Sequence, residues 1–358
     1  MTQILSFLGK GGSGRTTAAI ALARQSAAGG ARTLVLSLGS DPSPDMLLAQ
    51  DLAATPIAVA PNLEAVRMPA TAAVNRGWEE LQTLEAQYLK TPFLRNIYSS
   101  ELALLPGFEP ILLLTELRRW LDQGYDRICL DGLSSPELLR LWGVPESLDW
   151  YLRRFRGAIA DSEFGRNLGP FLPALSAAVF SVGLSIDDWG PAARLLETAL
   201  EQGRSLLADP LKAMAILTTR SDRVSQAVAL QWWGSAQPIG LRVGAVLASE
   251  TPVLDDLKRD FAPLPVFALS SAAADSVLPS FDVLNRAPDP LTIDLQARQI
   301  KLFLPGLAKE SVKLSQSGPE ITIEAGDQRR NLRLPVALQG RAVASARFQE
   351  QSLILSFQ

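Results

Sequence analysis

The sequence predicts an α/β fold, a doubly wound parallel sheet with a helical subdomain, followed by a small all-β sandwich. Short apolar runs typical of buried strands alternate with segments of helical periodicity through residue 285. The first of these strands leads into a loop dense in glycine and then into an alanine-rich helix. From Pro290 onward the helical periodicity stops, and short alternating strands separated by turn residues follow. We therefore expect two domains, at residues 1–285 and 286–358.

The loop after the first strand has the composition of a phosphate-binding (P-loop) turn. The apolar run Ile4–Leu8 precedes it, and a helix is predicted from Arg15. Glycines let backbone N–H groups approach an anion, and the helix adds its positive N-terminal end. The hydroxyl of Thr16 stands where Mg²⁺ would be held. A glycine turn without a ligand is the alternative, but the flanking strand and helix favour a phosphate site. The residues expected to contact the nucleotide here are Lys10, Gly11, Gly12, Ser13, Gly14, Arg15, Thr16 and Thr17.

Arg15 occupies the lysine position of the pattern G-x-x-x-x-G-K-[ST]. Lysine is a compact point charge that can bend over the β- and γ-phosphates, whereas arginine is a longer planar fork that pairs bidentately. We therefore expect nucleotide binding to be retained and the hydrolysis of ATP to ADP and phosphate to be weakened.

Two aspartates follow predicted buried strands. Asp41 comes after the strand at residues 32–38, and Asp131 ends the strand Arg127–Asp131. Because ligands bind at the carboxyl ends of parallel strands, we expect Asp131 to reach Mg²⁺ through water and Asp41 to orient the attacking water. Asp41 has an alternative role as the cap of the next helix, with Pro42 at the first helical position.

The middle of the chain is predominantly helical. Helical periodicity covers residues 70–90 and Glu109–Asp122, and their apolar positions predict core faces. The turn at residues 132–140 enters another helix, and in a nucleotide switch such a loop senses the γ-phosphate. Residues 145–209 are helical in pattern and strongly apolar, and Asn167–Ile186 carries no charge over twenty residues. That length approaches a bilayer span, but its prolines and glycines favour a buried or groove-lining helix.

The remaining strands fall into two groups. Strands at Lys212–Thr219, Leu241–Ala248 and Pro265–Leu269 return to the parallel sheet, and helices follow the first two after Asp222 and Pro252. Seven strands of a β-sandwich are predicted at Leu291–Leu295, Gln299–Leu304, Ser311–Leu314, Glu320–Glu324, Asn331–Leu334, Ser345–Phe348 and Ser352–Phe357.

Composition excludes several classes of function. The chain has 358 residues, 47% of them hydrophobic, a net charge of −3 and no long basic block, so we expect no nucleic-acid partner. It contains no histidine, and its one cysteine, Cys129, is predicted to lie in the core. Internal disulfides and Ser-His-Asp or Cys-His catalysis are thereby excluded, and zinc or iron–sulfur sites within one chain are not expected. The first strand begins almost at Met1, so we expect a cytoplasmic protein without a signal peptide, not an integral membrane protein.

Three segments together resemble one ATPase family. Lys10–Thr17, Ser40-Asp41-Pro42 and Asp131–Arg140 are similar to the loop and two switches of the family that contains the arsenite-pump ATPase and the guided-entry ATPase for tail-anchored membrane proteins. The resemblance covers residues 1 to about 285 and implies a homodimer that holds ATP and Mg²⁺ between its subunits.

The same resemblance assigns roles to single residues. Lys10 matches the "deviant Walker A" lysine, which implies action across the dimer on the partner's nucleotide. Asp41 would position water, and Asp131 would support Mg²⁺. Residues 145–209 would form a groove for a hydrophobic helix. Ser249 aligns with the asparagine that reads adenine in the family.

The C-terminal stretch is similar to the α-crystallin domain of small heat-shock proteins. Leu304-Pro305-Gly306, residues 326–335 and Ala346-Arg347-Phe348 before Leu353 carry this resemblance. Gln351 replaces the glycine of the pattern Ala-x-x-x-x-Gly-x-Leu. A fusion of the two modules in this order resembles the branch of the ATPase family found in photosynthetic lineages.

The chain also departs from the family. Its second switch reads Asp-Gly-Leu-Ser-Ser-Pro-Glu where the family usually has Asp-Thr-Ala-Pro-Thr-Gly-His. The Cys-x-x-Cys pair that binds zinc in the eukaryotic dimer is absent, so a dimer needs other contacts. The arsenite-binding cysteines are absent as well, which argues against metalloid export.

These observations predict an ATP-hydrolysing, homodimeric chaperone or targeting factor that shields a hydrophobic client. The alternative is a nucleotide-locked binding module, in which Arg15 holds ATP without turnover and the dimer stores a small lipophilic ligand or peptide. A partition or septum-positioning ATPase is disfavoured because we find neither a basic amphipathic helix nor a DNA-binding patch in the sequence. Nitrogenase-type electron transfer would need cluster cysteines that the chain does not have.

Overall fold

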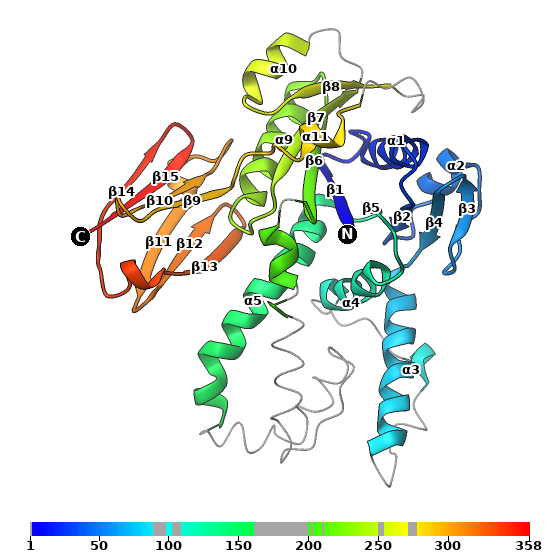
Figure 1. The fold of residues 1–358 in the computed structure, drawn as a ribbon, viewed down its shortest axis with the longest axis horizontal. Helices are drawn as coiled ribbons and strands as arrows, with labels where there is room; N and C mark the ends of the chain where they lie inside the picture. Colours follow the sequence, from blue (N-terminus) through cyan, green and yellow to red (C-terminus); the bar gives the residue numbers. More distant parts are fainter. Residues whose placement is uncertain are drawn as a thin grey trace.

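A computed structural model describes residues 2–88, 98–101, 109–160, 200–201, 203–209, 211–249, 254–270 and 278–358. A sheet of 8 strands, in the order β3-β4-β2-β5-β1-β6-β7-β8, forms the centre of the larger domain (Figure 1). The strands are β1 Gln3–Gly9, β2 Thr33–Ser37, β3 Ile57–Ala60, β4 Leu63–Arg67, β5 Arg127–Asp131, β6 Ala213–Arg220, β7 Val243–Ser249 and β8 Val266–Leu269. They pair in parallel except β3, which runs antiparallel to β4 at one edge.

The α/β prediction is confirmed, because helices cover both faces of this sheet. The helices are α1 Arg15–Ala28, α2 Ser43–Leu48, α3 Ala70–Tyr88, α4 Glu109–Leu121, α5 Ser135–Ala160, α9 Arg223–Ala236, α10 Leu254–Asp260 and α11 Phe281–Leu284, with a 3-10 turn at Ser99–Glu101. Alternate residues of β1 point into two separate apolar cores. Leu5 and Phe7 pack in the core that includes the buried face of α1, whereas Ile4 and Leu8 pack in the core that includes α4, α5 and α9.

Helix α5 differs from the predicted boundaries. It begins at Ser135 and continues through Pro145 to Ala160, so the proline lies inside a helix. A proline removes one helical hydrogen bond, but the fully buried Leu141 and Trp142 one turn earlier fix this helix against the sheet. The predicted groove at 145–209 lies largely outside the described residues, and the uncharged segment 167–186 lies wholly outside them. Across the described ranges, no helix is both long and apolar enough to span a bilayer.

The smaller domain contains two antiparallel sheets, β14-β15-β10-β9 and β11-β12-β13. Its strands are β9 Leu291–Asp294, β10 Gln299–Phe303, β11 Val312–Ser317, β12 Glu320–Ala325, β13 Gln328–Arg333, β14 Val343–Gln349 and β15 Ser352–Phe357, with 3-10 turns at Lys309–Ser311 and Val336–Leu338. Alternate residues of β10 and β12 fill the core between the sheets. The all-β prediction is confirmed, although β13 begins earlier than Asn331 because Gly326-Asp327 already makes the turn from β12.

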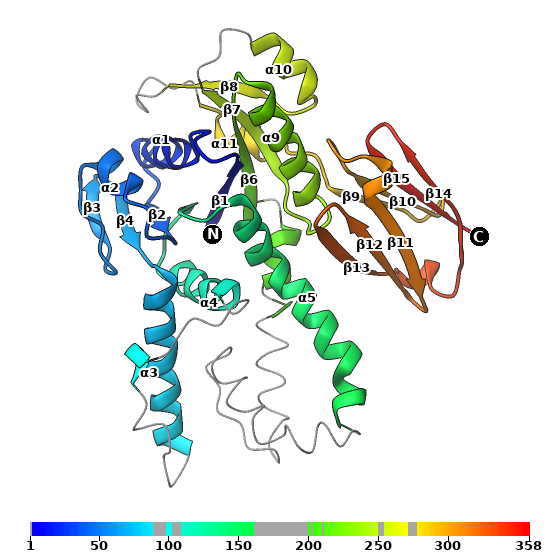
Figure 2. The same cartoon turned by 180° about the vertical axis from the view of Figure 1, so that it is seen from behind.

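The smaller domain packs against helices α9 and α5 of the larger one, as both views show (Figures 1 and 2). A Cβ on Gly234 of α9 would lie 2.2 Å from the Pro305 carbonyl oxygen, so only glycine permits this approach. Next to it, the rings of Trp233 and Phe303 meet edge to face at 5.3 Å.

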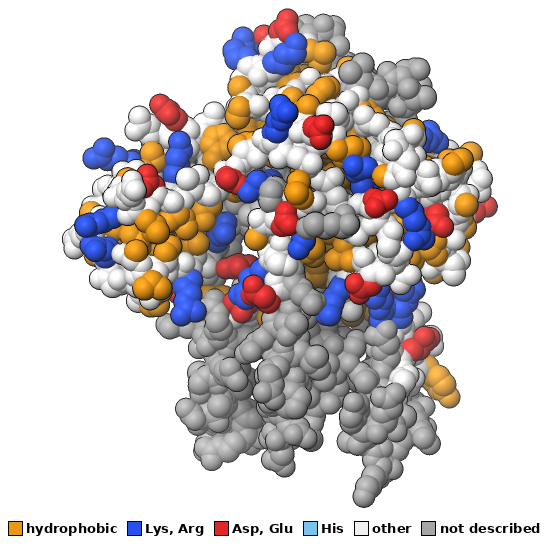
Figure 3. Space-filling model, viewed as in Figure 1, with side chains coloured by type: hydrophobic (Ala, Val, Ile, Leu, Met, Phe, Trp, Pro, Cys, Tyr) orange, Lys and Arg blue, Asp and Glu red, His pale blue; other side chains and the backbone are white. Residues whose placement is uncertain are grey.

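On the face of the molecule drawn in Figure 3, basic and acidic side chains are interspersed.

Candidate nucleotide site

The loop between β1 and α1 presents bare backbone at the carboxyl end of the sheet. Gly12 and Gly14 adopt φ values of 77° and 91°, a region that glycine enters without steric cost. A Cβ on Gly11 or Gly12 would meet nothing within 4 Å, so the space beside this backbone is open. Gly14 immediately precedes the first residue of α1. Exposed N–H groups at a helix N-terminus are well suited to bind a phosphate anion.

Buried hydroxyls anchor the loop to neighbouring elements. Ser13 Oγ lies 2.7 Å from Thr218 Oγ1 of β6, and both side chains are fully buried. Ser135 Oγ, at the start of α5, accepts a hydrogen bond from Gly9 N–H and donates one to the Gly9 carbonyl, each at 2.9 Å. The sequence prediction did not assign roles to Thr218 or Ser135. Their positions near the carboxyl ends of the strands that flank β1 are the signal that could have identified them.

Thr16 and Asp131, the two residues expected to hold Mg²⁺, lie next to each other in the structure. Thr16 Oγ1 donates a hydrogen bond to Asp131 Oδ1 at 3.0 Å. Burial raises the pKa of Asp131, and its Oδ2 is a buried oxygen without a hydrogen-bond partner among the described residues. A divalent cation with its water ligands satisfies such an oxygen, since hard cations prefer carboxylate and hydroxyl oxygens. These two residues therefore fit Mg²⁺. Thr17 follows, partly buried, in α1.

Asp41 lies in an exposed loop beside the loop that follows β5. Its Oδ1 accepts the Ser43 N–H at 2.7 Å, and hydrogen bonding by Ser43 holds the pKa of Asp41 below its usual range. The predicted cap is wrong: Pro42, not Asp41, is the N-cap residue of α2, and no side chain caps this helix. Asp41 lies one residue earlier, so its bond to Ser43 closes a turn before the helix. A Cβ on Gly39 would lie 2.6 Å from the Gly132 carbonyl oxygen, so the two loops touch through their backbones. The role of Asp41 toward water stays a prediction.

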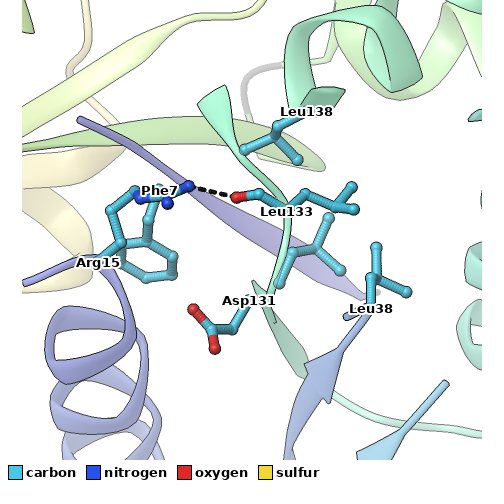
Figure 4. A pocket seen from close by; sticks show the side chains of 7 residues that line it. Phe7, Arg15, Leu38, Asp131, Leu133 and Leu138 are labelled. Carbon is cyan, nitrogen blue, oxygen red and sulfur yellow. Dashed lines mark hydrogen bonds between the residues drawn. The ribbon is translucent and has the colours of Figure 1, made fainter. Parts of the chain in front are cut away.

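The side chain of Arg15 points to the loop after β5 (Figure 4). Its Nη1 donates a hydrogen bond to the Leu133 carbonyl, and the side chain lines a small pocket with Asp131, Leu38 and Leu138. Desolvation lowers the pKa of Arg15, while the nearby Asp131, Glu137 and Asp41 charges oppose that shift. This contact with the loop after β5 was not predicted from the sequence.

Two predicted contacts lie farther out. Lys10 is exposed at the entrance of the loop. Hydrogen bonds from Ser225 and, to a smaller extent, the charge of Lys10 lower the pKa of Asp222 at the start of α9. Ser249 ends β7, and its Oγ donates to the Thr219 carbonyl at 3.3 Å. The roles of Lys10 toward a partner's nucleotide and of Ser249 toward adenine stay predictions.

Comparison with known families matches both domains. A family model described as an anion-transporting ATPase matches residues 2–225. A second model, described as an HSP20-like domain found in ArsA, matches residues 296–357. The resemblance drawn from the sequence is therefore confirmed for both modules.

Several relatives match this chain over nearly the whole length of both proteins. A putative arsenical pump-driving ATPase of Chlorobaculum tepidum is 24% identical over 99% of this chain and 96% of its own length. An uncharacterized protein of Streptomyces coelicolor is 28% identical over 99% of this chain and 97% of its own. The putative arsenical pump-driving ATPase 1 of Aquifex aeolicus is 21% identical, with 99% of both chains covered.

Proposed function

The chain belongs to the ArsA family of ATPases, and from that premise we propose that it binds ATP with Mg²⁺ and hydrolyses it to ADP and phosphate as a homodimeric chaperone or targeting factor. Family membership supports the coarser part, an ATP-binding ATPase. The main structural support for the nucleotide site is the bare loop at Gly11-Gly12, which lies beside the hydrogen-bonded pair Thr16 and Asp131. Thr16 and Asp131 would hold the cation, which would neutralise phosphate charge when bound. The loop amides would orient the phosphates.

Residues around the loop support a second copy as the partner. Lys10 is exposed at the mouth of the site. At the same end of the sheet, Met46 of α2 and Val224 of α9 are 78% and 60% exposed. Apolar side chains and an unburied lysine at one rim suit a contact that closes over the nucleotide. In the proposed dimer, Lys10 reaches the partner's phosphates, and Asp41 positions the attacking water.

The apolar composition of residues 145–209 supports a hydrophobic client. Of this region the structure describes residues 145–160 of α5, 200–201 and 203–209. Within α5, the Trp150 and Tyr151 rings meet edge to face at 5.1 Å, and Tyr151 is 54% exposed. Helix α5 extends away from the sheet in the same direction as α3 (Figure 1). A helix that extends away from the sheet, in a region rich in apolar residues, is better suited to bind a partner helix than a small polar ligand. Co-purification of the full chain with a hydrophobic-helix peptide tests this part.

Titration of the purified chain with Mg-ATP tests the nucleotide site. The substitution Gly14→Asp forces an L-residue to φ 91° and puts a negative charge at the N-terminus of α1. We expect it to weaken binding by at least about tenfold. Gly30→Asp is a matched control, because Gly30 has φ 89° and open space around its Cβ position after the end of α1. Equal affinity of wild type and Gly14→Asp would contradict the proposal.

The contact of Arg15 with the Leu133 carbonyl favours one other candidate function. In that alternative, the chain is a nucleotide-locked module that holds ATP without turnover and stores a small lipophilic ligand or peptide. Phosphate release separates the two: wild type near background, with a sharp rise in Arg15→Lys, would support the locked module. Turnover by the wild type supports the ATPase.

A further inference from the structure

Arg15 joins the phosphate loop to the loop that follows β5. It is the first residue of α1, and its Nη1 donates a hydrogen bond to the main-chain carbonyl of Leu133. Figure 4 shows the guanidinium directed to this oxygen, with the Asp131 carboxylate in the same pocket. The loop that would carry the phosphates and the loop that follows Asp131 are thus linked by one side chain.

The chemistry of arginine suits two partners at once. A guanidinium has five N–H donors in a rigid plane, and the bond to Leu133 uses one of them. Arginine keeps its charge in proteins, and the Asp131, Glu137 and Asp41 charges oppose the lowering of the Arg15 pKa by desolvation. Lysine carries a point charge on a flexible stem and does not hold a carbonyl and a phosphate in one fixed plane.

The Leu133 carbonyl is coupled to the start of α5. The Leu133 side chain is 8% exposed and packs in the core beneath the helix. The next residue, Ser134, donates its N–H to Glu137 Oε2 at 2.7 Å, which closes the first turn of α5 in the manner of a capping box. Ser135 then bonds Gly9 of the phosphate loop. A group that fixes the Leu133 carbonyl therefore also fixes the start of the helix.

We propose that Arg15 is a positioning residue whose guanidinium holds the Leu133 carbonyl with one donor and a phosphate of a bound nucleoside triphosphate with the others, so that binding orders residues 132–140. This inference rests on the proposed function, because it requires a triphosphate in the loop. It separates two properties of one side chain. Affinity depends on the positive charge, whereas ordering of residues 132–140 depends on the planar fork.

Hydrogen–deuterium exchange on the full chain tests this separation. Amide exchange is measured with and without a saturating magnesium complex of a slowly hydrolysed thiophosphate analogue of ATP, and the dissociation constant is measured by titration. The variants are Arg15→Lys and Arg15→Met. Arg24→Lys is the matched control, because Arg24 lies on the same helix, is exposed and donates to the Leu47 carbonyl at 3.3 Å.

In wild type and Arg24→Lys, we expect nucleotide to slow exchange in residues 132–140 by about tenfold. Arg15→Lys keeps the dissociation constant within about threefold of wild type but loses this protection at saturation. Arg15→Met weakens binding by more than about tenfold because the charge is gone. A purely structural role for Arg15 would change exchange equally with and without nucleotide.

Two results would overturn the inference. Full protection of residues 132–140 in saturated Arg15→Lys would show that the fork is not required. Binding to wild type without protection would show that the two loops are not coupled, and the proposed function would stand. If the titration shows no nucleotide binding to the wild type, both this role of Arg15 and the proposed function are overturned.

Discussion

The phosphate loop and the β14–β15 hairpin both turn the chain through left-handed conformations, but they use different residues. In the loop, the residues with positive φ are Gly12 and Gly14. In the hairpin they are Glu350 and Gln351, at φ 48° and 56°, although a two-residue turn of this kind favours asparagine and glycine. Side chains other than that of glycine cost free energy in this region.

The difference shows which demand shapes each turn. The hairpin has only to reverse the chain, so it tolerates two strained side chains at a cost in stability. The loop has to leave its amides uncovered for an anion, so a side chain would cost binding as well as stability. Substitutions in the loop should therefore change binding, whereas substitutions in the hairpin should change stability alone.

The largest effect is expected at Gly9, where the loop is also part of the sheet. A Cβ there would lie 2.3 Å from Thr218 Oγ1 and 2.4 Å from the Thr218 carbonyl oxygen. Gly9→Ala should therefore lower the free energy of unfolding by about 3 kcal/mol and abolish nucleotide binding. Gly11→Ala is the control, because open space surrounds that Cβ position and its stability should stay within about 0.5 kcal/mol of wild type. Urea unfolding measures the free energy of unfolding of both variants. Equal destabilisation of the two would contradict the steric explanation.

Asp131→Asn should separate binding from stability. The variant removes a buried charge whose Oδ2 has no hydrogen-bond partner among the described residues. We expect the free energy of unfolding, measured in chelator, to rise by about 1 kcal/mol. Magnesium-dependent nucleotide affinity should fall by about tenfold or more. A variant that loses stability together with affinity would mean that this carboxylate serves the fold and not the cation.

The smallest effect is expected in the hairpin. Gln351→Gly removes the strain of an L-residue in the left-handed region and should raise the free energy of unfolding by about 1 kcal/mol. The greater backbone entropy of glycine in the unfolded chain reduces this gain somewhat. Gln349→Gly, at the end of β14, is the control and should destabilise, because glycine weakens an extended strand. Thermal unfolding of the full chain measures both. Nucleotide affinity should be unchanged in both variants, and a change would break the contrast between the two turns.

The sequence was sufficient for the parts of the fold that depend on local pattern. Strand β1, the loop and α1 follow from an apolar run, glycines and alanines, and the Thr16–Asp131 pair follows from the parallel strand order. The edge strand β3 has four residues that alternate in burial, too short a pattern to distinguish from a loop.

Other features depend on tertiary contacts that a local pattern does not contain. The direction of Arg15 depends on where the Leu133 carbonyl lies, and the role of Ser135 depends on its distance from Gly9. Helix α5 continues through Pro145 because the proline ring packs against Gly203, which has no side chain to collide with the ring. Tertiary packing here outweighs the local tendency of proline to end a helix.

The single thiol of the chain lies at the centre of the sheet. It is on β5, the strand next to β1, and the loops proposed to bind the nucleotide follow these two strands. Cys129 is fully buried, and desolvation raises its pKa to about 12. An alkylating reagent reacts with thiolate, so it labels this residue only when the sheet has come apart. The chain thus carries a built-in reporter of global opening, one that needs neither an added label nor an engineered residue.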